Sequence, residues 1–239
     1  MSEGIEVQIA VAKVGKYATS ESGDTLEVVE RPHGGLSVVL ADGQRSGRAA
    51  KAISNIVVRK AMALLAEGVR DGAVARAAHD YLFLHRGGKV SAELHIVSVD
   101  LVSRTLVISR NSHCPVIAIK DGQLSLLDEP STPIGIYSHT KPVITELPLE
   151  PGTYLIAFTD GVLEAGQQSG QQLDLTALVP DLLTATAGQP QALADALLNQ
   201  AVVADQGRPR DDISVLVVAV LLDSNGDDVR RMSVSFPIR

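Results

Sequence analysis

Residues 36–50, LSVVLADGQRSGRAA, predict a buried strand that ends in an aspartate and leads straight into a helix. Residues 36–41 are nearly all apolar, and this run stops at Asp42 and Gly43. An Asp-Gly pair after a strand normally forms a hairpin turn, which requires a second strand directly after it. Here polar residues and then a helical pattern follow. We therefore expect the carboxylate of Asp42 at a strand-to-helix junction.

A second apolar strand, residues 153–158, is followed by an Asp-Gly pair at Asp160 and also lacks a return strand. Two other Asp-Gly pairs serve as comparisons. The pair at Asp121 lies between two short apolar runs and predicts a hairpin, and the pair at Asp71 is expected in a loop between two helices. Strand-terminal aspartates far apart in the sequence can meet at one edge of a sheet, so Asp42 and Asp160 are candidates for a shared site.

Two further aspartates stand at strand boundaries. Residues 25–31 are predicted to form a hairpin with the opening strand, which places Asp24 and Asp42 at the same end of an antiparallel pair. Asp211 lies just before residues 213–222, a run so apolar that it predicts a central strand covered on both faces.

The rest of the chain alternates between helical and strand periodicity. Apolar residues at helical spacing predict two consecutive helices after Gly47 and two more after Gln172. Period-two runs predict further strands at residues 5–12, 93–100, 104–109, 115–120, 123–127 and 142–147. The predicted fold class is α+β, an α-β-β-α sandwich in which two central antiparallel sheets are each flanked by a helical pair. A flat antiparallel sheet with helices on one side is the simpler alternative.

Composition limits the class of function. The chain has 239 residues, of which 45% are hydrophobic, enough for one domain with an aliphatic core. A formal net charge of -7 argues against a nucleic-acid partner, which normally requires a clustered basic face. No apolar run approaches the ~20 residues that span a bilayer, and the start of the chain lacks a signal-peptide pattern. Cys114 is the only cysteine, so we expect a cytoplasmic protein without membrane contact.

The four strand-boundary aspartates, Asp24, Asp42, Asp160 and Asp211, form a candidate metal site. Carboxylates gathered without cationic partners repel one another, and a raised pKa or a bound cation resolves the repulsion. Oxygen ligands without a Cys/His cluster favour Mg²⁺ or Mn²⁺ over Zn²⁺, and the carbonyl of Gly43 could add a ligand. An aspartate beside a glycine is also typical of a turn or helix cap, so spacing alone leaves both interpretations open.

Four motifs follow one another in a recognisable order: SGD at 22–24, ADGQRSG at 41–47, FTDGVLEA at 158–165 and RDDISVLVV at 210–218. In this order they resemble the metal-dependent PPM-type (protein phosphatase 2C-like) serine/threonine phosphatases. More narrowly, TPIGI at 132–136 and LEPG at 149–152 resemble the bacterial stage II sporulation protein E-like branch. The resemblance covers nearly the whole chain.

This resemblance implies two central antiparallel sheets between helical pairs and a centre of two Mn²⁺ or Mg²⁺ ions. By this resemblance, Asp42 is expected to bridge both ions and to form the catalytic pair with Asp24. Asp24 and the Gly43 carbonyl complete one metal shell, while Asp160 and Asp211 hold the other ion. The implied enzyme is a phosphoprotein phosphatase that uses a metal-bridging water and forms no phosphoenzyme. Its implied substrate is a phosphoserine or phosphothreonine protein, such as an anti-sigma-factor antagonist in a bacterial partner-switching pathway.

The chain departs from the family pattern at two places. Many relatives carry a histidine after the first Asp-Gly as a proposed general acid, whereas Gln44 has no ionisable proton, and a metal-bound water would then protonate the leaving group. His113 falls where relatives have a Gly-His loop, with Ser112 in place of that glycine, and a lone histidine more often has a structural role. These departures motivate an alternative function, a catalytically weak module with the phosphatase fold that binds a partner protein.

The sequence leaves the substrate-binding residues unknown. Candidates for phosphate contacts flank the motifs, with solvated surface charge as an equally good interpretation: Arg45, Arg48, Arg208 and Arg210. Cys114 is more typical of a small packed residue than of a nucleophile, because nothing near it in the sequence would lower its thiol pKa.

Residues 1–223 are expected to form the phosphatase domain, and residues 224–239 a C-terminal extension. The alternating stretch RMSVSFPI predicts an extra edge strand or an exchange with another subunit, which would make a homodimer. A disordered terminus is the alternative.

Overall fold

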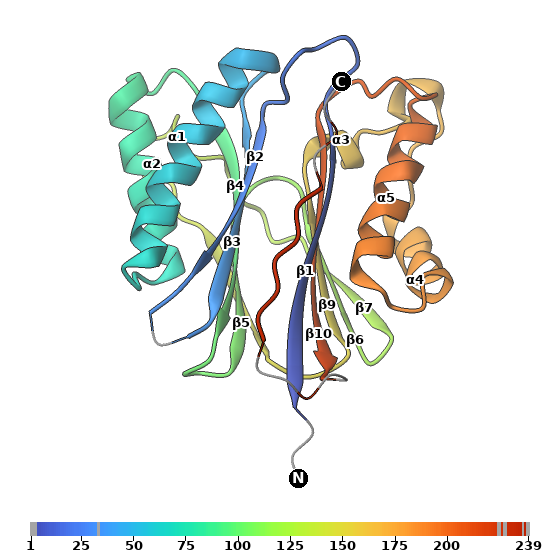
Figure 1. Ribbon diagram of the computed structural model, residues 1–239. Coiled ribbons are helices and arrows are strands. Elements are labelled where there is room, and N and C mark those ends of the chain that lie inside the picture. Colours follow the sequence, from blue (N-terminus) through green and yellow to red (C-terminus); the bar gives the residue numbers. More distant parts are fainter. Residues whose placement is uncertain (1–3, 33, 224–225, 227–228, 236, 238–239) are drawn as a thin grey trace.

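The computed structural model describes residues 4–32, 34–223, 226, 229–235 and 237. Two β-sheets pack face to face, and a pair of helices lies on the outer side of each (Figure 1). The strands are β1 (Ile5–Val14), β2 (Asp24–Glu30), β3 (Leu36–Gly43), β4 (Ala92–Asp100), β5 (Thr105–Asn111), β6 (Val116–Lys120), β7 (Gln123–Leu127), β8 (Val143–Pro148), β9 (Thr153–Phe158) and β10 (Ile213–Leu222). The helices are α1 (Gly47–Ala66), α2 (Asp71–Arg86), α3 (Asp160–Leu163), α4 (Leu175–Ala185) and α5 (Pro190–Ala204), with a 3-10 turn η1 (Gln167–Ser169).

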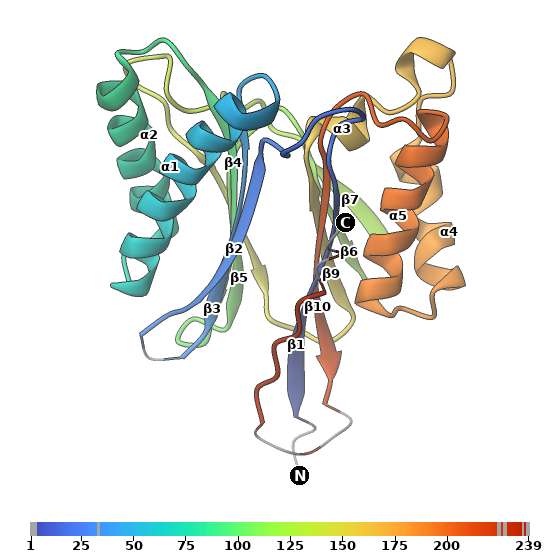
Figure 2. The ribbon, with the colours of Figure 1, turned by 45° about the horizontal axis from the view of Figure 1, so that its top comes forward.

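The first sheet has the strand order β1-β10-β9-β6-β7, and the second has the order β2-β3-β4-β5-β8. Neighbouring strands are antiparallel throughout both sheets. Helices α4 and α5 cover the first sheet, and α1 and α2 cover the second (Figure 2). The predicted α+β sandwich is confirmed, and the alternative of a flat sheet with helices on one side is wrong.

Three hydrophobic layers separate these elements: one between the two sheets and one beneath each helical pair. Strand β10 contributes to two of them, because Val215 and Val217 pack toward α4 and α5 while Leu216 and Val218 pack between the sheets. Successive side chains of a strand point to opposite faces, so a strand in this position must be apolar throughout. The prediction of a central strand covered on both faces is confirmed.

The helices begin close to where the periodicity changes. α1 begins at Gly47, as predicted, but α2 begins at Asp71, where we expected a loop. The buried Asp71 carboxylate lies 2.5 Å from the guanidinium of Arg31, and a negative charge also suits the first turn of a helix. The hairpin expected at Asp121 is confirmed between β6 and β7.

The C-terminal extension is described only in part. Residues 229–235 form neither helix nor strand, and Arg230 makes a 2.9 Å ion pair with Glu30 of β2. Apart from those residues and residues 226 and 237, the stretch 224–239 lies outside the described residues, so the extra edge strand and the tail-mediated homodimer stay predictions. Within the described part of the chain, no helix has the length and apolar character needed to cross a membrane.

Candidate metal centre

The element ends that carry the four predicted aspartates lie at one end of the sandwich, the upper end in Figure 1, and belong to both sheets or the segments next to them. Asp24 begins β2, and Asp42 stands next to last in β3, directly opposite it in the antiparallel register. Asp160 begins α3 immediately beyond β9, and Asp211 lies just before β10. The expectation that Asp24 and Asp42 share one end of a hairpin is confirmed.

Asp24 is fully buried, and its two carboxylate oxygens have different surroundings. Its Oδ2 accepts hydrogen bonds from Ser214 Oγ at 2.6 Å and from Thr159 Oγ1 at 3.1 Å, both of which come from the first sheet or its edge. Its Oδ1 is buried without a hydrogen-bond partner. Because a buried, unpartnered carboxylate oxygen is costly, this atom needs either a proton or a cation.

The pKa values show that these carboxylates act on one another. Burial, followed by the charges of Asp24 and Asp160, raises the pKa of Asp42 to about 11. Burial, followed by the charge of Asp211, raises the pKa of Asp160 to about 7. Burial also raises the pKa of Asp24. Carboxylates that cannot all ionise side by side are what a divalent cation stabilises, so the residues present fit an Mg²⁺ or Mn²⁺ site.

The motif glycines allow tight backbone packing around the site. A Cβ on Gly43 would lie 2.1 Å from the carbonyl oxygen of Ala50 in α1, and one on Gly161 would lie 2.2 Å from the carbonyl oxygen of Asp212. A Cβ on Gly23 would lie 2.6 Å from the Cβ of Ala50. The Asp-Gly pairs therefore have a packing reason that differs from a hairpin turn, and ligation by the Gly43 carbonyl stays a prediction.

The adjacent aspartates before β10 have different surroundings. Asp212 is buried, and its carboxylate accepts hydrogen bonds from the backbone N–H groups of Lys16 at 2.9 Å and Gly23 at 2.7 Å. Asp211 is half-buried, and its Oδ1 accepts only the N–H of Asp212, at 2.9 Å, among the interactions described. Asp212 thus stabilises the loops of the site, whereas Asp211 has carboxylate oxygen available for a metal ion beside Asp160.

Glu93, the residue of β4 directly opposite Asp42, was not predicted from the sequence as a site residue. Its Oε2 accepts a 2.6 Å hydrogen bond from Ser112 Oγ, and its Oε1 pairs with Nδ1 of His113. The hydrogen bonds from His113 and Ser112 lower the pKa of Glu93 despite its burial, and Glu93 raises the pKa of His113. The signal in the sequence was an acidic residue near the start of a predicted strand.

Glu93, His113 and Cys114 also place their potential ligand atoms within 4.8 Å of one another. In the described part of the chain, this is the one group of three His, Cys, Asp or Glu residues with that property. Cys114 is fully buried, and burial raises the pKa of its thiol, which agrees with the predicted packed residue and not with a nucleophile. His113 is half exposed and paired with Glu93, so it is not the isolated histidine that the sequence suggested.

Two lysines adjoin the acidic cluster and were also missed. Lys13 of β1 and Lys51 of α1 donate to the same backbone oxygen, that of Asp24, at 2.5 Å and 2.7 Å. Burial and the neighbouring Lys51 lower the pKa of Lys13, while the nearby aspartates favour its charged form. Gln44 lies at the exposed rim, where its Oε1 accepts a 3.3 Å hydrogen bond from the N–H of Ser91.

Comparison with known proteins assigns the family. The family model described as stage II sporulation protein E matches residues 32–221. The chain belongs to the stage II sporulation protein E family. The predicted resemblance is thereby confirmed at the level of family. Stage II sporulation protein E of Bacillus subtilis (strain 168) is 22% identical over 220 residues, which are 92% of this chain and 26% of that protein. The chain therefore spans about a quarter of this relative's length.

Solved structures agree on the fold. The PP2C phosphatase domain of the same Bacillus subtilis protein, solved with a fragment of its regulatory domain, matches with a TM-score of 0.77 at 21% identity, covering 90% of this chain and 63% of that one. The catalytic domain of the serine/threonine phosphatase PstP, solved with 2 manganese ions, matches with a TM-score of 0.68 at 16% identity, covering 91% of this chain and 100% of that one. At these identities the likeness establishes the PPM-type fold.

Proposed function

We propose that this chain is a metal-dependent protein phosphatase that hydrolyses phosphoserine and phosphothreonine in proteins. The observation that carries the proposal is the cluster of Asp24, Asp42 and Asp160, which has raised carboxylate pKa values and a buried oxygen without a partner. A family member with the PPM-type fold and such a cluster is best explained as a divalent-cation enzyme.

The ligand roles follow the resemblance and are compatible with the register. Asp42 stands opposite Asp24 on one side and Glu93 on the other, which suits a carboxylate shared by two ions. Asp24 and the Gly43 carbonyl would hold one ion, and Asp160 and Asp211 the other. When bound, Mn²⁺ or Mg²⁺ would polarise a phosphoryl oxygen and lower the pKa of water for in-line attack on phosphorus.

The remaining residues supply charge and protons. Lys13 and Lys51 place two ammonium groups beside the acidic cluster, where they offset part of the negative charge that would repel a phosphate. His113 is half exposed and its hydrogen bond to Glu93 raises its pKa, which favours the protonated ring that could donate a proton to the departing serine or threonine oxygen, a role that Gln44 cannot fill. This assigns the general acid to a different loop from the one seen in many relatives.

The direct test is turnover on a phosphoserine peptide and on p-nitrophenyl phosphate, with Mn²⁺ and with excess EDTA. We expect hydrolysis that requires Mn²⁺ or Mg²⁺ and stops on chelation. Turnover that ignores EDTA would exclude the metal-dependent mechanism.

A second function, a weakly catalytic module that binds a partner protein, is favoured by one observation. Gln44 occupies the rim of the site with its side chain engaged by the Ser91 backbone, and it offers no ionisable group. Efficient turnover on a protein substrate would dispose of this alternative. In either case we propose a cytoplasmic protein whose partner is a phosphoprotein, such as an anti-sigma-factor antagonist in a partner-switching pathway.

A further inference from the structure

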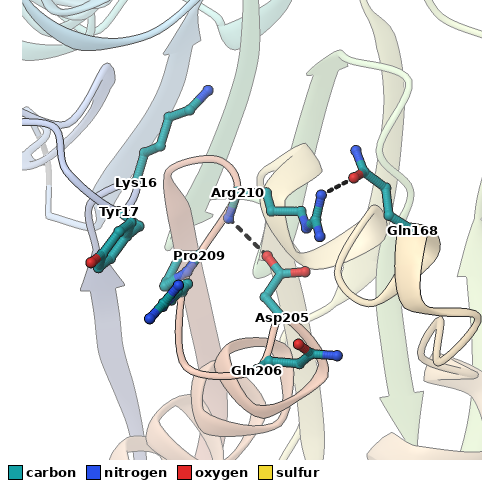
Figure 3. A pocket seen from close by; sticks show the side chains of 8 residues that line it. Lys16, Tyr17, Gln168, Asp205, Gln206, Pro209 and Arg210 are labelled. Carbon is teal, nitrogen blue, oxygen red and sulfur yellow. Dashed lines mark hydrogen bonds between the residues drawn. The ribbon is translucent and has the colours of Figure 1, made fainter.

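A cavity of about 730 Å³ is lined by none of the predicted metal ligands and is not used by the proposed chemistry (Figure 3). Three segments line it: the β1–β2 connection with Lys16 and Tyr17, η1 with Gln168, and the α5–β10 connection with Arg208 and Arg210. The last of these segments runs directly into Asp211 and β10. The cavity therefore shares one segment with the predicted metal centre, because Arg210 in its lining directly precedes Asp211.

Among the described residues, the charged side chains that line this cavity without an ion-pair partner are positive. Lys16, Arg208 and Arg210 line it, and none of them has an ion-pair partner among the described residues. The carboxylate of Asp205 also lines the cavity, but it is buried and accepts the backbone N–H groups of Gly166 at 3.0 Å and Arg210 at 2.8 Å. In a chain with a formal net charge of -7, a patch with three such cations is a local exception.

Two of the three cationic side chains, those of Arg208 and Arg210, are held in place. The Arg208 guanidinium lies over the ring of Tyr17, 5.3 Å from its centroid, and the Arg210 guanidinium donates to Gln168 Oε1. Figure 3 shows Arg210 pointing across the cavity toward Gln168. Guanidinium groups fixed in this way bind carboxylates at a smaller cost in side-chain entropy than mobile ones.

Hydrogen bonds also connect the wall of the cavity to the loops of the predicted metal centre. Tyr17 N–H donates to the Pro209 carbonyl at 2.8 Å, which joins the two loops. Lys16 N–H donates to Asp212, whose other carboxylate oxygen accepts the N–H of Gly23 beside Asp24. A ligand bound in the cavity is thereby held at a fixed position relative to the acidic cluster.

We infer that this cavity binds acidic residues that flank the phosphorylated residue of the protein substrate. This inference rests on the proposed phosphatase function. The volume suits several residues of an extended peptide, and the cations suit Asp and Glu side chains. The overall negative charge of the chain favours a short acidic segment over a nucleic acid, whose backbone requires a broad basic face.

The test uses the full chain and a double variant, Lys16→Gln with Arg208→Gln. Both changes remove charge without touching a predicted metal ligand, and Arg76→Gln on the exposed face of α2 serves as the matched control. Binding is measured by fluorescence anisotropy with two labelled, unphosphorylated peptides of equal length, one with Asp and Glu around a serine and one with Asn and Gln. Circular dichroism melting checks that each variant folds, and the single variant Arg208→Gln replaces the double one if the latter does not.

The wild-type chain should bind the acidic peptide about tenfold more tightly than the neutral one, because charged hydrogen bonds are gained at exposed positions. The double variant should lose that preference and Arg76→Gln should keep it. Equal affinity for both peptides, or a preference that survives the double variant, would overturn the inference.

Turnover separates this inference from the proposed function. The ratio of kcat/KM on the acidic phosphopeptide to kcat/KM on p-nitrophenyl phosphate should fall about tenfold in the double variant, because this ratio divides out any phosphate contact that Arg208 makes on both substrates. Absent hydrolysis together with a charge-dependent peptide preference would reject the phosphatase and retain the acidic-peptide site. Hydrolysis without that preference would retain the phosphatase and reject the acidic-peptide site.

Discussion

At the scale of single residues, the aspartates at this end of the sandwich have contrasting electrostatic environments. Asp212 accepts two backbone N–H groups, whereas Asp24 keeps one oxygen without a partner and Asp42 has a strongly raised pKa. The first environment stabilises the negative charge, and the second requires a proton or a metal ion. The structure thus separates structural carboxylates from candidate ligands without reference to any relative.

The pH dependence of stability tests the raised pKa of Asp42. Without metal, the folded chain binds a proton at Asp42 that the unfolded chain releases near its ordinary pKa, so the free energy of unfolding should fall as pH rises through the range between that value and about 11. The fall attributable to Asp42 is at most ~1.4 kcal/mol per pH unit. Urea unfolding in EDTA at pH 7, 8 and 9 should show this slope in the wild type and a flatter one in Asp42→Asn. Equal slopes would contradict the assignment.

Asp212 and Asp211 should respond differently to substitution. Asp212→Ala leaves the buried N–H of Gly23 and the partly buried N–H of Lys16 without acceptors, which should cost about 2–4 kcal/mol of unfolding free energy. Asp211→Ala should change stability little and instead weaken Mn²⁺-dependent turnover. Urea unfolding and kcat measurements on both variants check this, and the opposite pattern would assign the ligand role to Asp212.

The proposed proton donor His113 can be tested through the leaving group. Nitrophenolate leaves without protonation, whereas a serine alkoxide needs a proton, so His113→Gln should lower kcat about 10²-fold on a phosphoserine peptide and little on p-nitrophenyl phosphate. Since Glu93 raises the pKa of His113, Glu93→Gln should shift the alkaline limb of the peptide pH profile to lower pH. Equal losses on both substrates would indicate a structural role for His113.

At the scale of elements, the site depends on how closely strands meet helices. The end of β3 and the start of α3 pass within contact distance of other backbone, with Gly43 against Ala50 of α1 and Gly161 against Asp212. These approaches fix the backbone next to Asp42 and Asp160 at one end of the sandwich. The glycine of each Asp-Gly pair therefore allows the close backbone packing that positions the aspartate before it.

Gly43→Ala tests this packing. The added Cβ would lie 2.1 Å from the Ala50 carbonyl, so β3 and α1 must separate. We expect a loss of about 1–3 kcal/mol in unfolding free energy, together with weaker Mn²⁺ activation because Asp42 moves with the strand end. Gly47→Ala is not an adequate control, because Gly47 has a positive φ of 69°. Gly72→Ala, where the nearest atom is a side-chain carbon at 3.5 Å, is the better comparison.

Sequence patterns predicted most elements because each strand and helix has its own periodicity and its own terminating residues. They did not predict how strands divide between the sheets, since β5 and β6 follow one another in sequence yet belong to different sheets. Glu93 was missed because its position opposite Asp42 depends on the pairing of β3 with β4 across two intervening helices. The prediction of a loop at Asp71 was wrong. The ion pair with Arg31 favours a buried helix start at Asp71, and Arg31 is distant in sequence.

At the scale of the whole molecule, the sandwich brings carboxylates from two separately formed sheets to one end. Asp24 of the second sheet accepts a hydrogen bond from Ser214 of the first, so the site also joins the sheets across their interface. Its geometry consequently depends on how the two halves pack. Residues 1–223, the predicted phosphatase domain, include every predicted ligand, and the role of residues 224–239 stays a prediction.

The most direct test of the metal centre is a crystal structure of the chain soaked in Mn²⁺, with anomalous scattering recorded to locate manganese. Our account predicts manganese peaks bounded by the carboxylates of Asp24, Asp42, Asp160 and Asp211, and their absence in Asp42→Asn. A manganese peak at Glu93, His113 and Cys114 alone, or no ordered manganese at the aspartates, would contradict it.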